Sequence, residues 1–375
     1  MIKVTLLAIS VFLLGIPFFV YLSYIFGILL IKRKKIPLSD SAERISIVIP
    51  TRNEEKVIQH RIHNIANLNY PKKNIQVIIV DDDSEDNTIK LAKTAFKKFK
   101  IKSKIIKNKK RMGTNFSYNR GVKAANTEYI VTTDADVVFE KNSLLYLLSV
   151  LKEKRVGAVC GELKAVINKK TLSTSTEKPY RNMYGKMCTL ENELGSCFCF
   201  NGPLIMLKKS AFKEIPITTG ASDASAALSI IKKGYKTYYV QEAKFSELIT
   251  PNIKSQRRQK VRRATRLLEA MWNNKTLIFN GTAFGSFVFP LRFLMLFITP
   301  TALIIGTILF TITLYLQNPL FGLSLAFILL LIFLSGKIKS NFLASWLWHN
   351  IFLLEGLLKI YRNNFLWTSI ERKKV

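Results

Sequence analysis

The segment Tyr129-Ile-Val-Thr-Thr-Asp-Ala-Asp-Val-Val138 runs from an apolar strand pattern directly into two acids, Asp134 and Asp136. Side chains at alternate positions of an extended chain point to the same side, so both carboxylates can leave the strand end together. Paired carboxylates suit a divalent cation, Mg²⁺ or Mn²⁺, that takes its remaining ligands from a diphosphate and water. Loops are rich in acids, so this spacing alone fits a solvated turn equally well.

Two further apolar segments end in the same way. Residues 45–49 lead into Pro-Thr-Arg-Asn-Glu-Glu at 50–55, and residues 75–80 lead into Asp-Asp-Asp-Ser-Glu-Asp-Asn-Thr at 81–88. In an open α/β sheet, ligands bind outside the carboxyl ends of the strands. The sequence therefore predicts one crevice that receives polar side chains from three strand ends.

Strand and helix patterns alternate along the first half of the chain. We expect strands near 45–50, 75–81, 103–107 and 128–134, and helices near 54–68, 87–99, 114–125 and 141–153. This alternation predicts an α/β fold with a mostly parallel central sheet. The glycine fingerprints of dinucleotide folds and of phosphate-binding P-loops are missing from the sequence.

The chain of 375 residues carries a net charge of +32. Such charge is compatible with nucleic acid, an anionic membrane surface or an anionic substrate as partner. Zinc-finger spacing and aromatic RNA-binding motifs are missing, which argues against nucleic acid. The Lys-rich stretch from Lys90 to Lys110 predicts an amphipathic helix with a solvated basic face, followed by a strand; attachment to lipid headgroups is the alternative.

The four cysteines are Cys160, Cys188, Cys197 and Cys199. The close pair Cys197-Phe-Cys199 does not have the spacing of a zinc site. We expect all four to be buried as small apolar side chains.

Long apolar segments predict membrane helices. Residues 4–31 are longer than the roughly 20 residues that cross a bilayer core and end at Lys32-Arg-Lys-Lys35, which predicts a retained anchor. Further spans are expected over 287–316 and 319–336. Because Lys and Arg accumulate on the cytoplasmic side, the amino terminus and the 317–319 turn are predicted to face out.

The tail has a mixed apolar and polar pattern. Residues 341–361 predict an interfacial helix, with a fourth span as the alternative. The predicted domains are an anchor over 1–35, a catalytic domain over 36–283, two membrane helices over 284–336, and an interfacial helix with a basic tail over 337–375.

The strand-end segments together resemble the membrane-bound family 2 glycosyltransferases, which have the GT-A fold. The matching pieces are Val-Ile-Pro-Thr-Arg-Asn-Glu-Glu at 48–55, Val-Asp-Asp-Asp-Ser-Glu-Asp-Asn-Thr at 80–88 and Thr-Asp-Ala-Asp at 133–136. The resemblance covers roughly residues 44–270. The ending Trp-Thr-Ser-Ile-Glu-Arg at 367–372 is similar to a Trp-x-x-x-x-Arg ending of membrane-bound members.

The resemblance implies how a nucleotide-sugar would be bound. Asp82 would bind the uracil or ribose region, and Asp134 and Asp136 would hold the Mg²⁺ or Mn²⁺ that bridges the diphosphate. Arg111 lies in a run that keeps the family's glycines and asparagine, and it either contributes positive charge or is one more solvated cation. The base and ribose would be bordered by Pro50, Thr51, Asn53 and Glu54.

The resemblance also implies a general base and a diphosphate-binding motif. The segment at 219–236 places Asp223 on the base, with Ser222 where the family has Glu; the alternative is a helix cap. Residues 256–266 resemble the Gln-x-x-Arg-Trp motif. The favoured register assigns it to Gln259, Arg262 and Arg263, and the other register puts Lys260 at the Trp position. Asn201 and Gly202 are weaker acceptor-site candidates.

The resemblance and the membrane segments together predict an inverting, metal-dependent glycosyltransferase of the cell membrane with its catalytic domain in the cytoplasm. It would move a sugar from a nucleotide-sugar, with a UDP-sugar favoured, to a membrane-associated acceptor such as a lipid-linked glycan. The alternatives are a processive polysaccharide synthase and an inactive scaffold of the same fold. We expect no nucleic-acid partner.

Overall fold

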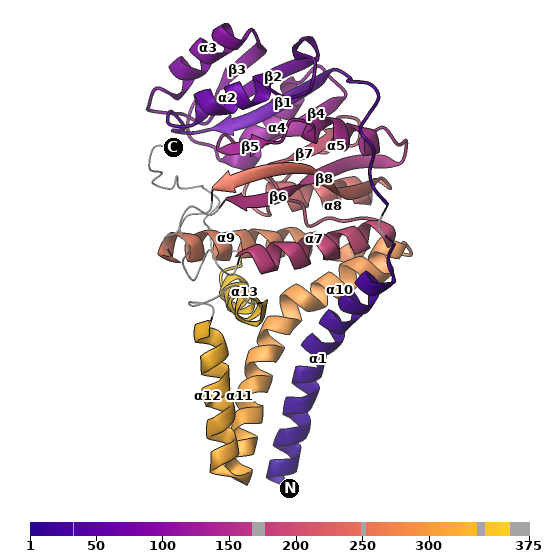
Figure 1. The fold of residues 1–375 in the computed structure, drawn as a ribbon, viewed down its shortest axis with the longest axis vertical. Coiled ribbons are helices and arrows are strands. Elements are labelled where there is room, and N and C mark those ends of the chain that lie inside the picture. The colour runs from indigo at the N-terminus through magenta and orange to yellow at the C-terminus, as the bar shows by residue number, and fades with distance from the viewer. Residues whose placement is uncertain (33, 167–176, 249–252, 336–341, 361–375) are drawn as a thin grey trace.

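The computed structural model describes the chain except for residues 33, 167–176, 249–252, 336–341 and 361–375. The Trp-x-x-x-x-Arg ending at 367–372 lies outside the described residues. Figure 1 shows an α/β domain at one end of an elongated molecule and a group of long helices at the other.

The α/β domain is built on an eight-stranded sheet of order β3-β2-β1-β4-β7-β6-β8-β5. Strands β3, β2, β1 and β4 are parallel to one another, as the sequence predicts. Strand β7 is antiparallel to both of its neighbours, and β5 is antiparallel to β8, so the second half of the sheet is mixed. The strands are Ile45–Thr51 (β1), Ile75–Asp81 (β2), Lys102–Lys107 (β3), Tyr129–Thr132 (β4), Val137–Phe139 (β5), Val156–Val166 (β6), Ile205–Lys208 (β7) and Lys236–Leu248 (β8).

Helices cover both faces of the sheet. One apolar cluster packs under α2, α3 and α5. The other lies under α4 and α8 and continues into the helices below. The four predicted helices are confirmed with slightly shorter bounds. The helices of this domain are Ile58–Ala66 (α2), Thr88–Phe99 (α3), Thr114–Ala124 (α4), Ser143–Leu151 (α5) and Ser222–Lys232 (α8), with the 3₁₀ turn Lys72–Asn74 (η1).

Helix α4 lies very close to the central strand β1. A Cβ added at Gly121 would be 2.2 Å from Cγ1 of Val48, so only glycine permits this approach. Asn119 on the same helix donates to the carbonyl of Ile215 (2.8 Å) and accepts from its N–H (3.0 Å). These contacts explain why the segment after Arg111 has asparagine at position 119 and glycine at position 121.

The long helices form the other end of the molecule. Within the described ranges, two helices are long and apolar enough to cross a membrane, Ile2–Leu30 (α1) and the continuous helix 284–317. The latter comprises η3 (Phe284–Val288), α10 (Phe289–Phe293), η4 (Leu294–Ile298) and α11 (Thr299–Gln317). The third predicted span forms α12, Pro319–Ser335, which is apolar but shorter.

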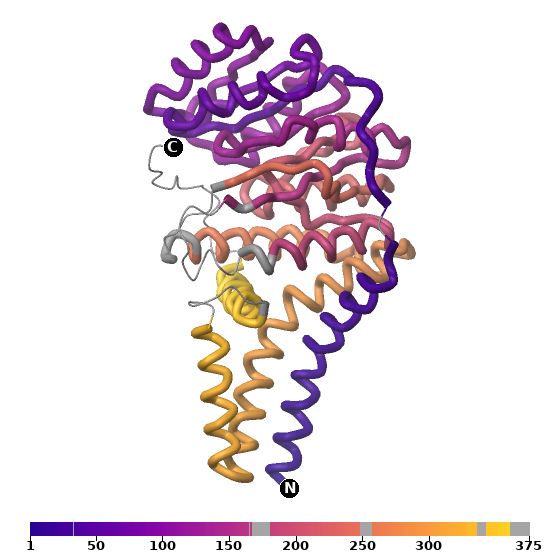
Figure 2. Tube along the Cα trace, in the orientation of Figure 1, coloured from indigo at the N-terminus to yellow at the C-terminus, as the bar shows by residue number. Residues whose placement is uncertain are grey.

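The predicted turn at 317–319 joins α11 to α12 at the same end of the molecule as the amino terminus (Figure 2). Nζ of Lys3 donates to the carbonyl of Leu316 at 2.6 Å, which ties these two regions together. The predicted orientation requires the amino terminus and the 317–319 turn to lie on the same side, and in the structure they do. The orientation and the domain boundaries stay predictions.

A layer of helices separates the sheet from the long helices. It contains α7 (Glu177–Glu193), α9 (Ile253–Trp272) and α13 (Phe342–Leu357); η2 (Lys275–Leu277) follows α9. In Figure 1, α13 is seen almost end-on, whereas α11 and α12 run along the long axis. A helix that crosses the others in this way suits the predicted interfacial position better than a fourth span.

The Lys-rich stretch lies at the opposite end of the molecule from α1, α11 and α12 (Figure 1). It forms α3 and the outermost strand β3, on which Lys102, Lys104 and Lys107 are exposed. This placement favours the solvated face over attachment to lipid headgroups. The four cysteines are buried as free thiols, as expected.

A buried ion pair joins three of the helices. Nε of Arg292 on α10 donates to Oε1 of Glu191 on α7, and the hydroxyl of Tyr24 on α1 donates to the same oxygen at 2.7 Å. The side chains of Arg292 and Glu191 are 5% and 1% exposed. An ion pair this deep holds the helices in a fixed arrangement because neither charge can be left unpaired cheaply.

We predict that Glu191→Ala will destabilise the protein by about 3–5 kcal/mol, because it leaves the Arg292 charge buried without its partner. Thermal unfolding of the detergent-solubilised protein measures the effect. The double variant Glu191→Met with Arg292→Met should recover most of the loss. An unchanged unfolding midpoint for Glu191→Ala would contradict the role of the pair.

Candidate active site

A cavity of about 460 Å³ opens where the strands end. It extends from the carboxyl ends of β1 and β4, past the first turn of α8 and one face of α9, to α1, η4 and α13. Its size is within the range of small-molecule sites. Its two ends differ, since acids and hydroxyls line the sheet end and Tyr21, Leu296, Trp346 and Phe352 line the other.

The structure brings almost all of the predicted site residues to this cavity. Those that line it are Pro50, Thr51, Glu54, Asp82, Arg111, Asp134, Asp136, Asp223, Gln259, Arg262 and Arg263. Asn53 is exposed and does not belong to the described lining; its Oδ1 accepts from the N–H of Glu85 at 3.0 Å. Asn53 also has a positive φ of 53°, so its place in the structure is at the turn after β1.

The carboxylate of Asp82 is already engaged with the loop before α4. Its Oδ1 accepts from Nδ2 of Asn108 (2.8 Å) and from the N–H of Met112 (2.7 Å), and its Oδ2 accepts from the N–H of Gly113 (2.8 Å). A carboxylate offers about four acceptor positions, so about one remains for a ligand. Asp82 therefore shapes this wall of the cavity, and its predicted contact with a base or ribose stays a prediction.

Asp134 lies in a group of negative charges. Burial raises the pKa of Asp134 to about 7, and the charges of Asp136 and Glu247 add to the rise. The hydroxyl of Tyr118 donates to Oδ1 of Asp134 at 3.2 Å. The charge of Asp136 thus disfavours the ionised form of Asp134, and a divalent cation bound between the two acids would relieve that repulsion.

This donor set fits the implied cation. Asp134 and Asp136 supply carboxylate oxygens, which Mg²⁺ and Mn²⁺ prefer. Both side chains line the cavity, in which a diphosphate could complete the ligand set.

Asp223 lies in the first turn of α8. Its Oδ1 accepts from the N–H of Ala224 at 2.8 Å, and a Cβ added at Gly202 would be 3.1 Å from its Oδ2. Burial raises the pKa of Asp223, although the N–H groups nearby oppose the shift. The N-cap of α8 is Ala221, and no described side chain makes a cap hydrogen bond there, so Asp223 does not act as the helix cap. Its position in the cavity wall and its raised pKa favour the role of general base.

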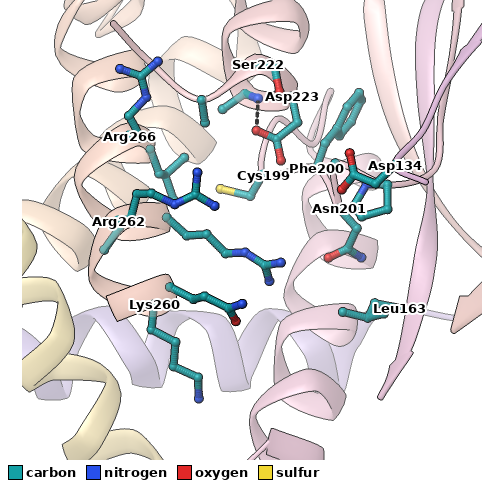
Figure 3. A pocket seen from close by; sticks show the side chains of 18 of the residues that line it. Asp134, Leu163, Cys199, Phe200, Asn201, Ser222, Asp223, Lys260, Arg262 and Arg266 are labelled. Atoms are coloured by element: carbon teal, nitrogen blue, oxygen red, sulfur yellow. Dashed lines mark hydrogen bonds between the residues drawn. The ribbon is translucent and has the colours of Figure 1, made fainter. Parts of the chain in front are cut away.

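A row of cations faces these acids across the cavity. Figure 3 shows Lys260, Arg262 and Arg266 along α9 on one side, and Asp134, Asn201 and Asp223 on the other. Arg263, on the same helix, forms an ion pair of 3.0 Å with Glu247 on β8. Gln259 and Lys260 both line the cavity, so both registers of the Gln-x-x-Arg-Trp motif bring residues to it.

Several residues that line this cavity were not predicted from the sequence. Tyr118 lies in an ordinary helix pattern, and Glu247 lies near the end of the long strand β8 with no motif around it. Arg181 and Tyr184 on α7 lie in a segment with no recognisable motif. Nη1 of Arg181 donates to Oδ1 of Asn201 at 3.2 Å. Arg266 was readable from its spacing, since it lies one helical turn after Arg262 and Arg263.

Part of the chain matches a known protein family. The model of glycosyl transferase family 2 matches residues 46–216, which contain the strand ends that carry Asp82, Asp134 and Asp136. Residues 46–216 form a family 2 glycosyltransferase domain. This match confirms the predicted resemblance to family 2 glycosyltransferases. The sheet topology and the structural likeness described below confirm the α/β, GT-A fold class.

Individual relatives match only part of the chain, at 26–32% identity. A probable glycosyltransferase YdaM of Bacillus subtilis is 32% identical over 134 residues, 35% of this chain and 32% of the relative. A poly-beta-1,6-N-acetyl-D-glucosamine synthase of Staphylococcus epidermidis is 26% identical over 215 residues, 54% of this chain and 51% of the relative. The chain thus spans about half or less of the length of these relatives.

A solved structure matches almost the whole chain. The mannosyltransferase PcManGT of Pyrobaculum calidifontis, in complex with GDP-Man and Mn²⁺, has a TM-score of 0.78 at 19% identity over 96% of this chain and 98% of the other. This likeness shows that the glycosyltransferase domain and the helices around it share one fold with that protein.

The raised pKa of Asp134 gives a prediction for Asp134→Asn. An aspartate unfolds with a pKa near ~3.9, so between about pH 4 and 7 the folded state holds a proton that the unfolded state releases. Stability therefore falls as pH rises through this window, and the penalty is complete above about pH 7. We expect Asp134→Asn to raise the melting temperature at pH 8 in EDTA, by about 1–2 °C per kcal/mol removed.

The same variant should lose any stabilisation by Mn²⁺. Differential scanning fluorimetry at pH 5 and pH 8, with EDTA or Mn²⁺, measures both effects. A melting temperature that falls at pH 8 in EDTA would contradict the repulsion inferred for the Asp-x-Asp segment.

Proposed function

We propose that the protein is an inverting, metal-dependent glycosyltransferase that transfers a sugar from a nucleotide-sugar to a membrane-associated acceptor. The observation that carries this proposal is one cavity in which the Asp-x-Asp carboxylates, Asp223 and the cations of α9 face one another. The family 2 domain supports the reaction class.

The donor would lie at the sheet end of the cavity. Asp134 and Asp136 would hold Mg²⁺ or Mn²⁺, which when bound neutralises charge on the diphosphate. Among the described residues, buried Oγ1 of Thr51 has no hydrogen-bond partner. It lines the cavity beside Pro50 and Glu54, so it is available to the ribose or base. Arg262 and Arg263 suit the departing nucleoside diphosphate, because guanidinium groups bind phosphate oxygens through paired hydrogen bonds.

Asp223 would act as the general base that takes the proton from the acceptor hydroxyl. A base works best when its pKa lies near the operating pH, and burial raises the pKa of Asp223 in that direction. The hydroxyl oxygen then attacks the anomeric carbon from the face opposite the leaving diphosphate. A single displacement of this kind inverts the configuration at that carbon.

The acceptor would enter from the other end of the cavity. That end is lined by Tyr21, Leu296, Trp346 and Phe352, from α1, η4 and α13. Two of these elements belong to the helices long enough to span a membrane. We therefore propose a lipid or lipid-linked glycan as acceptor, and an integral protein of the cell membrane with its catalytic domain in the cytoplasm.

The test is Asp223→Asn, which removes the basic carboxylate and keeps the shape of the side chain. We expect transfer to fall at least about 100-fold, in line with the usual contribution of a general base, while binding of UDP or GDP with Mn²⁺ is kept. The assay uses UDP- and GDP-sugars, since the protein of matching fold was solved with GDP-Man. Membrane lipid extract provides the acceptor.

Asp40→Asn is the matched control, because it makes the same chemical change at an exposed position outside the cavity. If Asp223→Asn transfers at the parental rate, the assignment of Asp223 as general base fails. Nucleotide binding by the parental protein without turnover of any donor would favour the inactive scaffold.

A processive polysaccharide synthase is the second candidate. The naming of the Staphylococcus relative as a poly-beta-1,6-N-acetyl-D-glucosamine synthase favours it. Product length separates the two candidates, because single transfer adds one sugar to each acceptor and a processive enzyme makes long chains while acceptor is still in excess.

A further inference from the structure

Arg61 lies on α2, behind the Asp-x-Asp segment, and is 1% exposed. It shares the buried face of that helix with Ile58, Ile62 and Ile65. A charged side chain in such a position is costly unless its groups are paired. Its partners therefore indicate what the residue does.

The guanidinium group of Arg61 holds both ends of the acidic loop. Its Nη2 donates to Oγ1 of Thr133 at 3.0 Å, and its Nη1 donates to the carbonyl of Val137 at 3.3 Å. Thr133 comes directly before Asp134, and Val137 comes directly after Asp136. The two hydrogen bonds thus bracket the loop that carries the metal-binding carboxylates.

Asn64, one turn later on α2, connects Arg61 to Phe139 on β5. It accepts from Nη1 of Arg61 at 2.7 Å and from the N–H of Phe139 at 2.9 Å, and it donates to the carbonyl of Phe139 at 3.0 Å. The guanidinium group also lies over the ring of Phe139, 3.9 Å from its centre. Strand β5 is therefore fixed against α2 immediately after the acids.

Arg61 also provides a positive charge beside the acids. Burial lowers the pKa of Arg61 to about 9, and the attraction of Asp134 and Asp136 opposes that decrease. The group therefore stays charged at neutral pH. Its charge offsets part of the repulsion between the two carboxylates.

We propose that Arg61 and Asn64 are positioning residues that hold the Asp134–Asp136 loop in the conformation that binds the divalent cation. This inference rests on the proposed function, which assigns the cation to these two acids. The groups that support metal ligands usually change metal affinity by about 10–100-fold when they are mutated. A purely structural Arg61 would instead affect stability and leave metal affinity unchanged.

The experiment measures Mn²⁺ binding directly on the full-length protein in detergent. Titration with Mn²⁺, followed by the electron paramagnetic resonance signal of the free ion, is done alone and with UDP or GDP. We expect Arg61→Met and Asn64→Ala to weaken Mn²⁺ binding by about 10–100-fold. Arg61→Lys should lie between them and the parent, because it keeps the charge and loses the two-pronged contact with the loop.

Asn74→Ala is the matched control. Nδ2 of Asn74 donates to the carbonyl of Ala42, outside the residues that line the cavity, so its loss should leave Mn²⁺ binding unchanged. A second readout is turnover against Mn²⁺ concentration. The positioning role requires a higher Mn²⁺ concentration for half-maximal turnover, with the rate at saturation within about threefold of the parent, a difference of about 0.7 kcal/mol or less.

The outcomes separate the two proposals. Parental Mn²⁺ affinity in a folded Arg61→Met protein overturns the positioning role and leaves the proposed function intact. If Arg61→Met does not fold, parental affinity in both Arg61→Lys and Asn64→Ala has the same meaning. If the parental protein binds no Mn²⁺ with or without nucleotide, the metal-dependent function fails, and the positioning role fails with it.

Discussion

Repulsion among carboxylates in one cavity is the constraint on which the rest of this structure depends. Burial raises the pKa of Asp134 to about 7, and the charges of Asp136 and Glu247 add to the rise. Such a group of charges is stable only where cations surround it, and the fold brings cations from two directions. Arg61 approaches from the interior through α2, and Arg263 approaches from the facing helix α9. A dication with a diphosphate would complete the same balance from the open side.

The cavity also connects two environments that are usually separate. Its polar end lies at the carboxyl ends of parallel strands, and its other end lies among α1, η4 and α13. The buried pair of Arg292 and Glu191, with the hydroxyl of Tyr24, keeps α10 and α1 in place relative to α7, which forms part of the wall. Under the proposed function, a hydrophilic donor would enter this cavity from one end and a membrane-associated acceptor from the other.

The parts of this arrangement that were predictable from sequence are those with a local pattern. The first four strands follow from apolar runs that stop at polar residues, and the acids at their ends mark the sheet edge at which ligands bind. The mixed half of the sheet was not predictable, because the pairing of β7 with β4 and β6 joins segments far apart in the chain. Arg61 occupies a position that the helix pattern assigns to an apolar residue, so only its contacts reveal its role. Asn53 was expected in the cavity from its motif, yet it lies exposed in the turn after β1, where its φ is positive.

The basic outer strand β3 has a consequence for how copies of this protein coexist. An unpaired strand at the border of a sheet offers its backbone groups to any extended chain, including that of a neighbour. If the protein lies in a membrane, as proposed, its copies would share two dimensions and meet one another more often than molecules in free solution. Lys102, Lys104 and Lys107 place like charges along that border, so two such strands repel before they can join into a continuous intermolecular sheet.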